Sequence, residues 1–310
     1  MELTETRRIG EALGRAVVGA RPLAGGYSHE TSLLSVAGGG QVVARLGGAA
    51  PAVEAAVMAA GRTRVPVPEV LHVLPAVVEP YEARATMVLE YVHGTPLSRT
   101  LARGGDPADL RALGAEVGRV VARVGAVTFD RPGFFTDARL TVGRDERPWS
   151  RQLPELAEAC VAAAPAERLD PATRRAWVKL CEAHAPALER VDHQARLVHA
   201  DINPKNILVS RTASGWRVDA VLDWEFSYSG CPYGDAANML RFGDAYPDGF
   251  VDGFRRGFRD GRALPDEDWE YLGRVLDMFA LSDLVTRPPG HEIADAAAGM
   301  IRRWTARPFT

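Results

Sequence analysis

The sequence predicts an α+β protein with two lobes: a small antiparallel sheet over residues 1–93 and a larger, mainly helical lobe over residues 94–310. In the first part, short apolar runs are separated by glycine and proline, which is typical of strands joined by turns. After residues 94–96, apolar side chains recur every three or four positions, as they do in amphipathic helices. A hydrophobic content of 46% in 310 residues is enough for one large core or two medium ones.

The N-terminal elements follow from their apolar runs and turn residues. Three consecutive glycines at 38–40 place a hairpin turn between two apolar runs. Pro51 marks the start of a helix, and a turn is expected near Pro80. The expected order is a strand, a hairpin, a helix and two further strands, over residues 15–23, 30–47, 51–63 and 77–92.

Two helices of the C-terminal lobe have the same start signal. Asp106 and Asp170 each precede a proline, so that an acid caps the helix and proline takes its first position. Apolar side chains of the first helix then follow at helical spacing: Leu110, Leu113, Val117, Val120, Val121 and Val124. A third helical stretch, residues 249–285, is interrupted near Gly261 and Pro265.

A second hairpin, over residues 206–224 with its tip at 213–215, has polar residues at its base. Asn206 starts the first strand and Asp223 ends the second, so the hairpin brings both to the same end of neighbouring strands. An amide oxygen beside a carboxylate suits Mg²⁺ that bridges phosphates. Asp201, just ahead of this site, is placed to orient an attacking hydroxyl and accept its proton. Taken singly, each of these residues is better explained by hydrogen bonds in a turn or at a strand end.

Composition argues against several classes of protein. The formal net charge of -3 disfavours nucleic-acid binding, which requires strongly basic faces. No apolar run is long enough for a membrane span, and the N-terminus lacks the apolar stretch of a signal peptide. The three widely spaced cysteines, Cys160, Cys181 and Cys231, indicate reduced structural thiols. We therefore expect a cytoplasmic protein that binds neither nucleic acid nor membranes.

Two segments, HADINPKNILV and VLDWE, together resemble the catalytic and metal-binding segments of the aminoglycoside phosphotransferase family. That family shares the protein-kinase-like fold, and the resemblance extends from about residue 20 to about residue 242. It implies that Asp201 is the catalytic base and that His199 braces the loop. It also implies that Asn206 and Asp223 hold Mg²⁺.

Two further segments resemble the same family. GCPYGDAANML implies that Asp235 supports the catalytic loop from the start of a helix, although Cys231 stands where the family usually has an acid. MVLEYVHGTPL resembles the hinge between the lobes, where the backbone of Glu90, Tyr91 and Val92 would bond the adenine edge. An ordinary core strand would have the same hydrophobicity.

The resemblance also implies a nucleotide site in the N-terminal lobe. Gly25, Gly26 and Ser28 lie between two strands, where the family has its nucleotide loop, although a plain hairpin turn would use the same glycines. Arg45 occupies the strand position where kinases usually carry a lysine for the α- and β-phosphates, and its planar guanidinium suits phosphate oxygens. Glu54 in the following helix would hold Arg45 forward. The alternative is that both are surface residues.

The acceptor site is less well defined. Trp224 and Glu225 directly follow Asp223 and are candidates to face the acceptor. Acids are frequent between residues 235 and 283, Asp244 and Asp248 among them, and an acidic face would attract a polycationic substrate. Interleaved arginines favour the alternative that most of these acids only keep helix faces solvated.

These observations predict an enzyme that transfers the γ-phosphoryl group of ATP or GTP to a hydroxyl of a small molecule with the help of Mg²⁺. The resemblance favours a cationic antibiotic, an aminoglycoside or a tuberactinomycin-type peptide, and hence antibiotic resistance or self-protection of a producer. A metabolic kinase for choline, homoserine, a fructosamine or another sugar is the alternative. A nucleotide-binding pseudokinase is disfavoured because Asp201, Asn206 and Asp223 are all present. The acceptor, the choice of nucleotide and the oligomeric state stay open.

Overall fold

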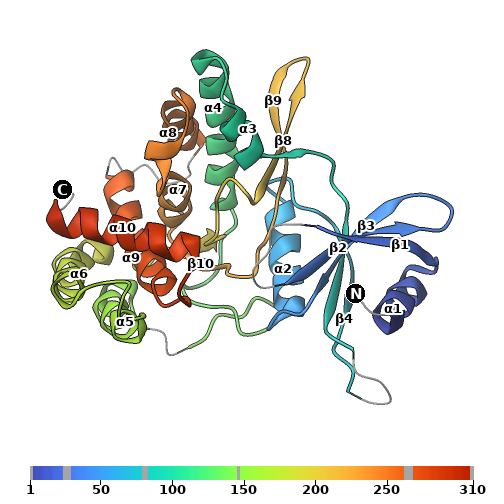
Figure 1. Cartoon of the computed structure of the whole chain (residues 1–310), viewed down its shortest axis with the longest axis horizontal. Helices are drawn as coiled ribbons and strands as arrows, with labels where there is room; N and C mark the ends of the chain where they lie inside the picture. Colours follow the sequence, from blue (N-terminus) through green and yellow to red (C-terminus); the bar gives the residue numbers. More distant parts are fainter. Residues whose placement is uncertain (1–2, 24–28, 79–82, 145–146, 262–267, 308–310) are drawn as a thin grey trace.

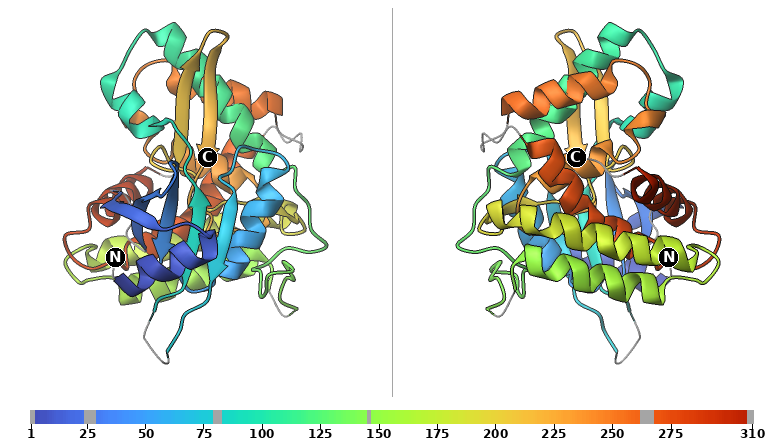
Figure 2. Two further views of the ribbon diagram at one scale, coloured as in Figure 1. Left: turned by 90° about the vertical axis from the view of Figure 1, so that its right-hand side faces the viewer. Right: turned by 90° about the vertical axis from the view of Figure 1, so that its left-hand side faces the viewer.

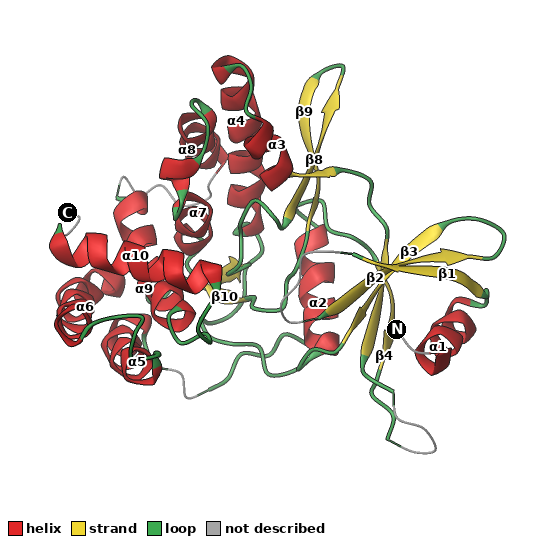
Figure 3. Ribbon diagram, in the orientation of Figure 1, coloured by secondary structure: helices red, strands yellow, loops and turns green. Residues whose placement is uncertain are grey.

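The computed structural model describes residues 3–23, 29–78, 83–144, 147–261 and 268–307, and it confirms the α+β class. A five-stranded sheet with helices α1 and α2 forms one part of the molecule, and helices α3 to α10 form the other (Figures 1 and 3). This is the expected two-lobed arrangement. The boundary between residues 93 and 94 stays a prediction.

The N-terminal sheet is antiparallel, with the strand order β1-β2-β3-β5-β4. Its elements in chain order are α1 (Leu3–Leu13), β1 (Val17–Pro22), β2 (Glu30–Val36), β3 (Gln41–Leu46), α2 (Pro51–Arg62), β4 (Val70–Leu74) and β5 (Thr86–Glu90). The expected hairpin is β2 and β3, and the three glycines 38–40 in its turn all have positive φ, a region that glycine adopts without strain. Helix α2 lies on the side of the sheet that faces the helical part (Figure 1).

Sequence signals do not predict two of these elements. Helix α1 has no proline at its first position, and it is positioned by Ile9, which packs into a small core with Leu34 of β2 and Val88 of β5. Strand β4 follows a stretch broken by prolines, but both prolines precede Val70 and leave the strand intact. The expected first strand of residues 77–92 is reduced to a single bridge between residues 77 and 83, and the turn near Pro80 lies outside the described residues.

The second part combines helices with two small sheets. Its elements in chain order are β6 (Thr95–Pro96), α3 (Leu97–Arg103), α4 (Pro107–Val124), α5 (Trp149–Ala163), α6 (Pro171–His184), η1 (Ala185–Arg190), β7 (Arg196–Val198), β8 (Ile207–Thr212), β9 (Gly215–Val221), β10 (Tyr228–Gly230), α7 (Tyr233–Leu240), η2 (Gly243–Ala245), α8 (Phe250–Gly261), α9 (Trp269–Leu284) and α10 (Glu292–Ala306). Strand β8 pairs with β6 and β9, and β7 pairs with β10. The predicted second hairpin is confirmed as β8 and β9, which stands beside α4 (Figure 2).

The predicted helix starts are confirmed. Side chains of Asp106 and Asp170 each accept two backbone N–H groups of the first turn of α4 and α6. The stretch 249–285 is divided into α8 and α9, as expected, and Pro265 lies outside the described residues. Helices α5 and α10 were not expected: α5 starts without a side-chain cap and contains Pro154.

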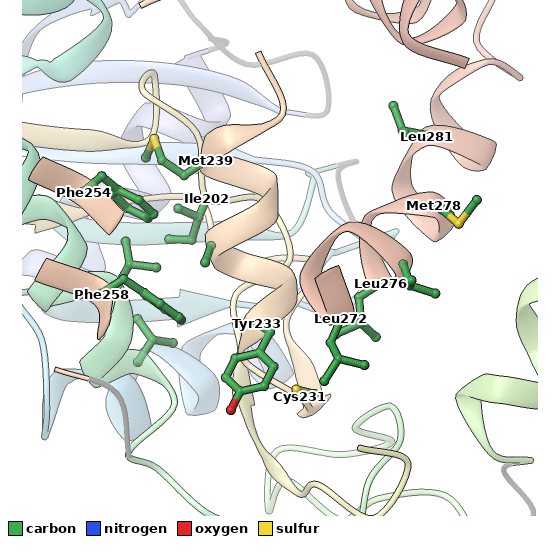
Figure 4. Packing of buried hydrophobic residues seen from close by; sticks show 14 of the residues in the cluster. Ile202, Cys231, Tyr233, Met239, Phe254, Phe258, Leu272, Leu276, Met278 and Leu281 are labelled. Carbon is green, nitrogen blue, oxygen red and sulfur yellow. The ribbon is translucent and has the colours of Figure 1, made fainter. Parts of the chain in front are cut away.

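Helices α4 and α8 pack unusually closely because glycines line their contact. A Cβ atom at Gly118 of α4 would lie 2.3 Å from the carbonyl oxygen of Phe254, and one at Gly257 of α8 would lie 2.0 Å from that of Ala115. On the adjoining face of α8, Phe254 and Phe258 point into the main core near α7 (Figure 4). This core holds α7 in place, and α7 in turn supports the loop after β7.

Candidate active site

Asp201 lies in the loop between β7 and β8, and amide groups hold both of its carboxylate oxygens. Nδ2 of Asn203 donates to Oδ1 at 3.0 Å, and Nδ2 of Asn206 donates to Oδ2 at 2.7 Å. Burial, and secondly the negative charge of Asp223, raise the pKa of Asp201 to about 6. The carboxylate is therefore fixed in position and is a stronger base than an exposed aspartate.

The hairpin brings Asp223 next to Asn206, as the sequence predicts. Strands β8 and β9 pair residue 207 with 221, and the N–H of Leu222 donates to the carbonyl of Asn206 at 2.8 Å. Asp223 has a φ of 68°, in the left-handed region that few residues other than glycine adopt. Such strain is typical of functional sites, where the surrounding structure holds the backbone in place.

Asp235 and His199 hold the loop of Asp201 in place through hydrogen bonds. Asp235 is fully buried in the first turn of α7, and its carboxylate accepts the N–H groups of His199 and Ala200, both at 2.9 Å. Burial raises its pKa to about 7. The loop is thus anchored to a helix of the main core, consistent with the supporting role that the resemblance implies for Asp235.

The imidazole of His199 joins the two segments of the site. Its Nε2–H donates to the carbonyl of Leu222 at 2.9 Å, and its Nδ1 accepts the N–H of Asp201 at 3.2 Å. Burial lowers the pKa of His199 to about 4, so the ring is neutral and both nitrogens have defined roles. His199 therefore positions Asp201 relative to Asp223.

Arg45 extends from the N-terminal sheet into the same site and is not a surface residue. One guanidinium nitrogen lies 2.5 Å from Oε1 of Glu54 in α2, and the other lies 2.8 Å from Oδ1 of Asp223. Burial raises the pKa values of Glu54 and Asp223, and the charge of Arg45 opposes both shifts. The predicted pairing of Arg45 with Glu54 is present, together with a contact to Asp223 that the sequence did not indicate.

For the other residues predicted to bind the nucleotide, the structure describes only some of the contacts. Gly25, Gly26 and Ser28 lie outside the described residues. Glu90 ends β5, and its N–H donates to the carbonyl of Glu69 at 2.9 Å, so this group is already used within the protein. The adenine contact at the hinge, including the part expected of Val92, stays a prediction.

The two residues after Asp223 do not both face a ligand. Trp224 is buried, its indole N–H donates to the carbonyl of Val221 at 2.9 Å, and its ring packs against Gly61. The expectation that Trp224 faces the acceptor is therefore wrong, because the apolar ring is better accommodated in the core. Glu225 instead points to His29, which directly precedes strand β2, with 2.8 Å between Oε2 and Nε2.

A cavity of about 270 Å³ lies between α7, α8, α9 and α10, and no sequence pattern predicted it. Arg241 lines this cavity and is held by the carboxylate of Asp277. Its positive charge opposes part of the rise in the pKa of Asp201 that burial causes. Asp244 also lines the cavity, whereas the exposed Asp248 is not among its lining residues. The complete lining consists of Ala237, Leu240, Arg241, Asp244, Arg255, Trp269, Glu270, Arg274, Asp277, Met300, Arg303 and Trp304.

The fold and this site agree with the comparison against protein families, in which residues 19–271 match the phosphotransferase enzyme family, APH. The chain belongs to this family. The resemblance seen in the sequence is thereby confirmed, as is the expectation of an enzyme that transfers a phosphoryl group to an alcohol.

Solved structures of similar fold include several phosphotransferases, whereas no curated protein matches the chain. A thermostable variant of the aminoglycoside phosphotransferase APH(4)-Ia, in complex with ADP and hygromycin B, is 19% identical with a TM-score of 0.70, and the match covers 98% of this chain and 99% of that one. The GDP and kanamycin complex of APH(2")-IIIa is 15% identical with a TM-score of 0.68, covering 99% and 100%. A candidate fructosamine-3-kinase of Thermobifida fusca is 17% identical with a TM-score of 0.60, covering 96% and 98%.

The residues of this phosphotransferase fit a Mg²⁺ ion. Asn206 uses its amide nitrogen to hold Asp201, which leaves its amide oxygen as a ligand atom. Arg45 contacts one oxygen of Asp223, and the carboxylate has a second. Hard oxygen donors of this kind are the ligands that Mg²⁺ prefers.

In the described part of the chain, no helix is long and apolar enough to cross a membrane.

Proposed function

We propose that this family member transfers the γ-phosphoryl group of ATP, or of GTP, to a hydroxyl group of a small molecule. The observation that carries the proposal is the convergence of Asp201, Asn206, Asp223 and Arg45 at one place from three separate segments: the loop before β8, the end of β9 and strand β3. Nucleotide use is supported by the ADP and GDP complexes of the similar structures. Asn206 and Asp223 would hold Mg²⁺, which supplies positive charge to the phosphate groups.

Asp201 acts as the general base in this proposal. Its carboxylate, held by Asn203 and Asn206, accepts the proton of the acceptor hydroxyl as the oxygen bonds to the γ-phosphorus. The bond between the γ-phosphorus and the bridging oxygen breaks, and the nucleoside diphosphate leaves with that oxygen. Arg45 offsets negative charge on the phosphates, because its guanidinium stays charged at any physiological pH.

For the acceptor, we propose a basic antibiotic as the first candidate. The proposal is supported by the similar structures that contain hygromycin B and kanamycin. Resistance or self-protection would be the biological outcome, and the enzyme would work in the cytoplasm, where ATP is present.

A metabolic kinase is the second candidate, and the cavity next to Arg241 favours it. Four of the residues that line this cavity are arginines and three are acids, so its described lining is not the acidic surface that a polycation needs. The similarity to a candidate fructosamine-3-kinase agrees with this alternative.

A direct assay separates the two candidates. The purified protein is incubated with ATP and Mg²⁺ against a panel of aminoglycosides, tuberactinomycin peptides, choline, homoserine and fructosamines, and products are identified by mass spectrometry. A phosphate ester of an antibiotic, dependent on Asp201, supports the first candidate. An ester of a metabolite alone supports the second, and the absence of any phosphorylated product with every panel member would contradict both.

A further inference from the structure

His29, Asp223 and Glu225 form a group of metal-ligating side chains that joins the two parts of the molecule. One donor atom from each residue lies within 4.8 Å of the other two. His29 comes from the chain just before β2, and the two acids come from the segment after β9. All three side chains are largely buried, with 6%, 28% and 17% of their surfaces exposed.

The imidazole ring of His29 makes one hydrogen bond and is closely packed. Nε2 lies 2.8 Å from Oε2 of Glu225, while Nδ1 is buried and has no hydrogen-bond partner among the described residues. Gly48 packs against the ring so closely that a Cβ there would lie 2.7 Å from Cε1, which fixes the orientation of the imidazole. The ring is therefore fixed with Nε2 facing the carboxylate of Glu225, even though Nδ1 is left without a partner among the described residues.

The nitrogen and oxygen ligand atoms of this group favour particular metal ions. One imidazole nitrogen with two carboxylate oxygens suits Zn²⁺, Mn²⁺ or Co²⁺, whereas Mg²⁺ prefers oxygen alone. Bond lengths of about 2.0–2.1 Å put neighbouring ligands of tetrahedral Zn²⁺ about 3.3 Å apart, so the contact between His29 and Glu225 would open by about half an ångström. The ion would replace the proton that now lies between these two atoms.

Local charge favours a divalent cation as well. Arg45 contacts two acids, Glu54 and Asp223, and ligand atoms of Asp223 and Glu225 lie within 4.8 Å of each other. Three carboxylates therefore lie in one small region with one guanidinium, an arrangement that attracts a cation. Arg45 contacts only one oxygen of Asp223, so the other remains a ligand atom.

We propose that His29, Asp223 and Glu225 bind a transition-metal ion such as Zn²⁺ in the nucleotide-free enzyme and so join the N-terminal sheet to the segment after β9. The binding does not depend on the proposed function. The consequence for catalysis does rest on it: because Asp223 is shared, the ion excludes Mg²⁺ from that carboxylate and inhibits transfer.

Co²⁺ provides a spectroscopic test that needs neither nucleotide nor acceptor. Tag-free protein is titrated with Co²⁺, and we expect one equivalent to produce visible d–d absorption without a thiolate charge-transfer band. Zn²⁺ should then abolish the absorption by displacing Co²⁺. His29→Ala should weaken binding about tenfold or more, as expected for loss of a ligand. The exposed His193 is the matched control, and His193→Ala should bind Co²⁺ like the original protein.

Glu225→Gln keeps the shape of the side chain and removes one charged ligand, so it tests the same site if His29→Ala fails to fold. Unchanged Co²⁺ absorption in Glu225→Gln, or a thiolate band that assigns the ion to a cysteine, would overturn the proposal. In a turnover assay, Zn²⁺ inhibition that falls about tenfold in His29→Ala would support the shared use of Asp223. Co²⁺ binding at His29 without any turnover would contradict only the proposed function.

Discussion

At the scale of single residues, Asp201 is set apart from other acids by burial and by two amide donors. Asp201→Asn keeps the shape of the side chain and removes the base. We expect turnover to fall by about 10²–10⁴-fold, the usual contribution of a general base. Nucleotide affinity should stay within a few-fold in a direct binding assay. Asp252→Asn on the exposed face of α8 is the control, and near-normal turnover by Asp201→Asn would remove the assignment.

The pKa of Asp201 also sets a pH dependence. Because the pKa is raised to about 6, the carboxylate is mostly ionised at pH 7 and becomes protonated as the pH falls through 6. Only the ionised form accepts a proton, so kcat should fall about tenfold per pH unit below this value. A profile from pH 5 to 8 measures the inflection. Residual activity of Asp201→Asn should show no such inflection.

Arg45 is predicted to act through its charge at the proposed nucleotide site. Arg45→Ala should raise KM for ATP more than KM for the acceptor, because its guanidinium lies beside Glu54 and Asp223, where the phosphates and Mg²⁺ are expected to bind. Arg45→Lys restores the charge without the planar fork and should recover part of the affinity. Steady-state kinetics with each substrate varied in turn distinguishes the two effects. A larger change for the acceptor would place Arg45 outside the nucleotide site.

At the scale of elements, the contact between α4 and α8 depends on glycine. Gly257→Ala places a methyl group against the backbone of Ala115, which cannot move aside without separating the helices. We expect the free energy of unfolding to fall by about 1–3 kcal/mol despite the better helix propensity of alanine. Gly299→Ala in α10 meets nothing within 4 Å and should stabilise by about 1 kcal/mol through propensity alone. Denaturant unfolding of both variants measures the contrast.

The elements that the sequence predicted share a local signal. Asp106 and Asp170 cap their helices, and the glycines 38–40 turn the hairpin, because these interactions lie within a few residues of each other. Helix α5 has no such signal at its start and is defined by side chains that pack against distant helices. The close approach of α4 and α8 was also not predicted, since a glycine within a helix usually indicates only a weak helix.

At the scale of the whole molecule, the site forms where two separate parts meet. The motif predicted that Asn206 and Asp223 lie together because one hairpin joins them. Contacts of Arg45 with Asp223, and of His29 with Glu225, connect residues 178 and 196 positions apart in the chain. The hydrophobic periodicity of a sequence gives no information on contacts between residues so far apart in the chain. Arg241, which influences Asp201 from the end of α7, was missed for the same reason.

Ligand binding across the two parts should be visible as thermal stabilisation. Mg²⁺ with a non-hydrolysable ATP analogue should raise the midpoint of unfolding, since a ligand that binds only the folded state stabilises it. Asp223→Asn should keep most of the increase given by nucleotide alone and lose the additional increase given by Mg²⁺. EDTA should abolish turnover of the original protein. Equal stabilisation of Asp223→Asn by Mg²⁺ would contradict the assignment of Asp223 as a metal ligand.

The arginine at position 45 has a consequence for alkaline conditions and for covalent chemistry. A lysine amine loses its proton near pH 10 and reacts with acylating reagents, whereas a guanidinium does neither in the accessible range. Phosphate recognition by this enzyme should therefore persist at a pH that would neutralise an amine. Electrophilic compounds aimed at the strand lysine of other kinases will find no nucleophile at this position.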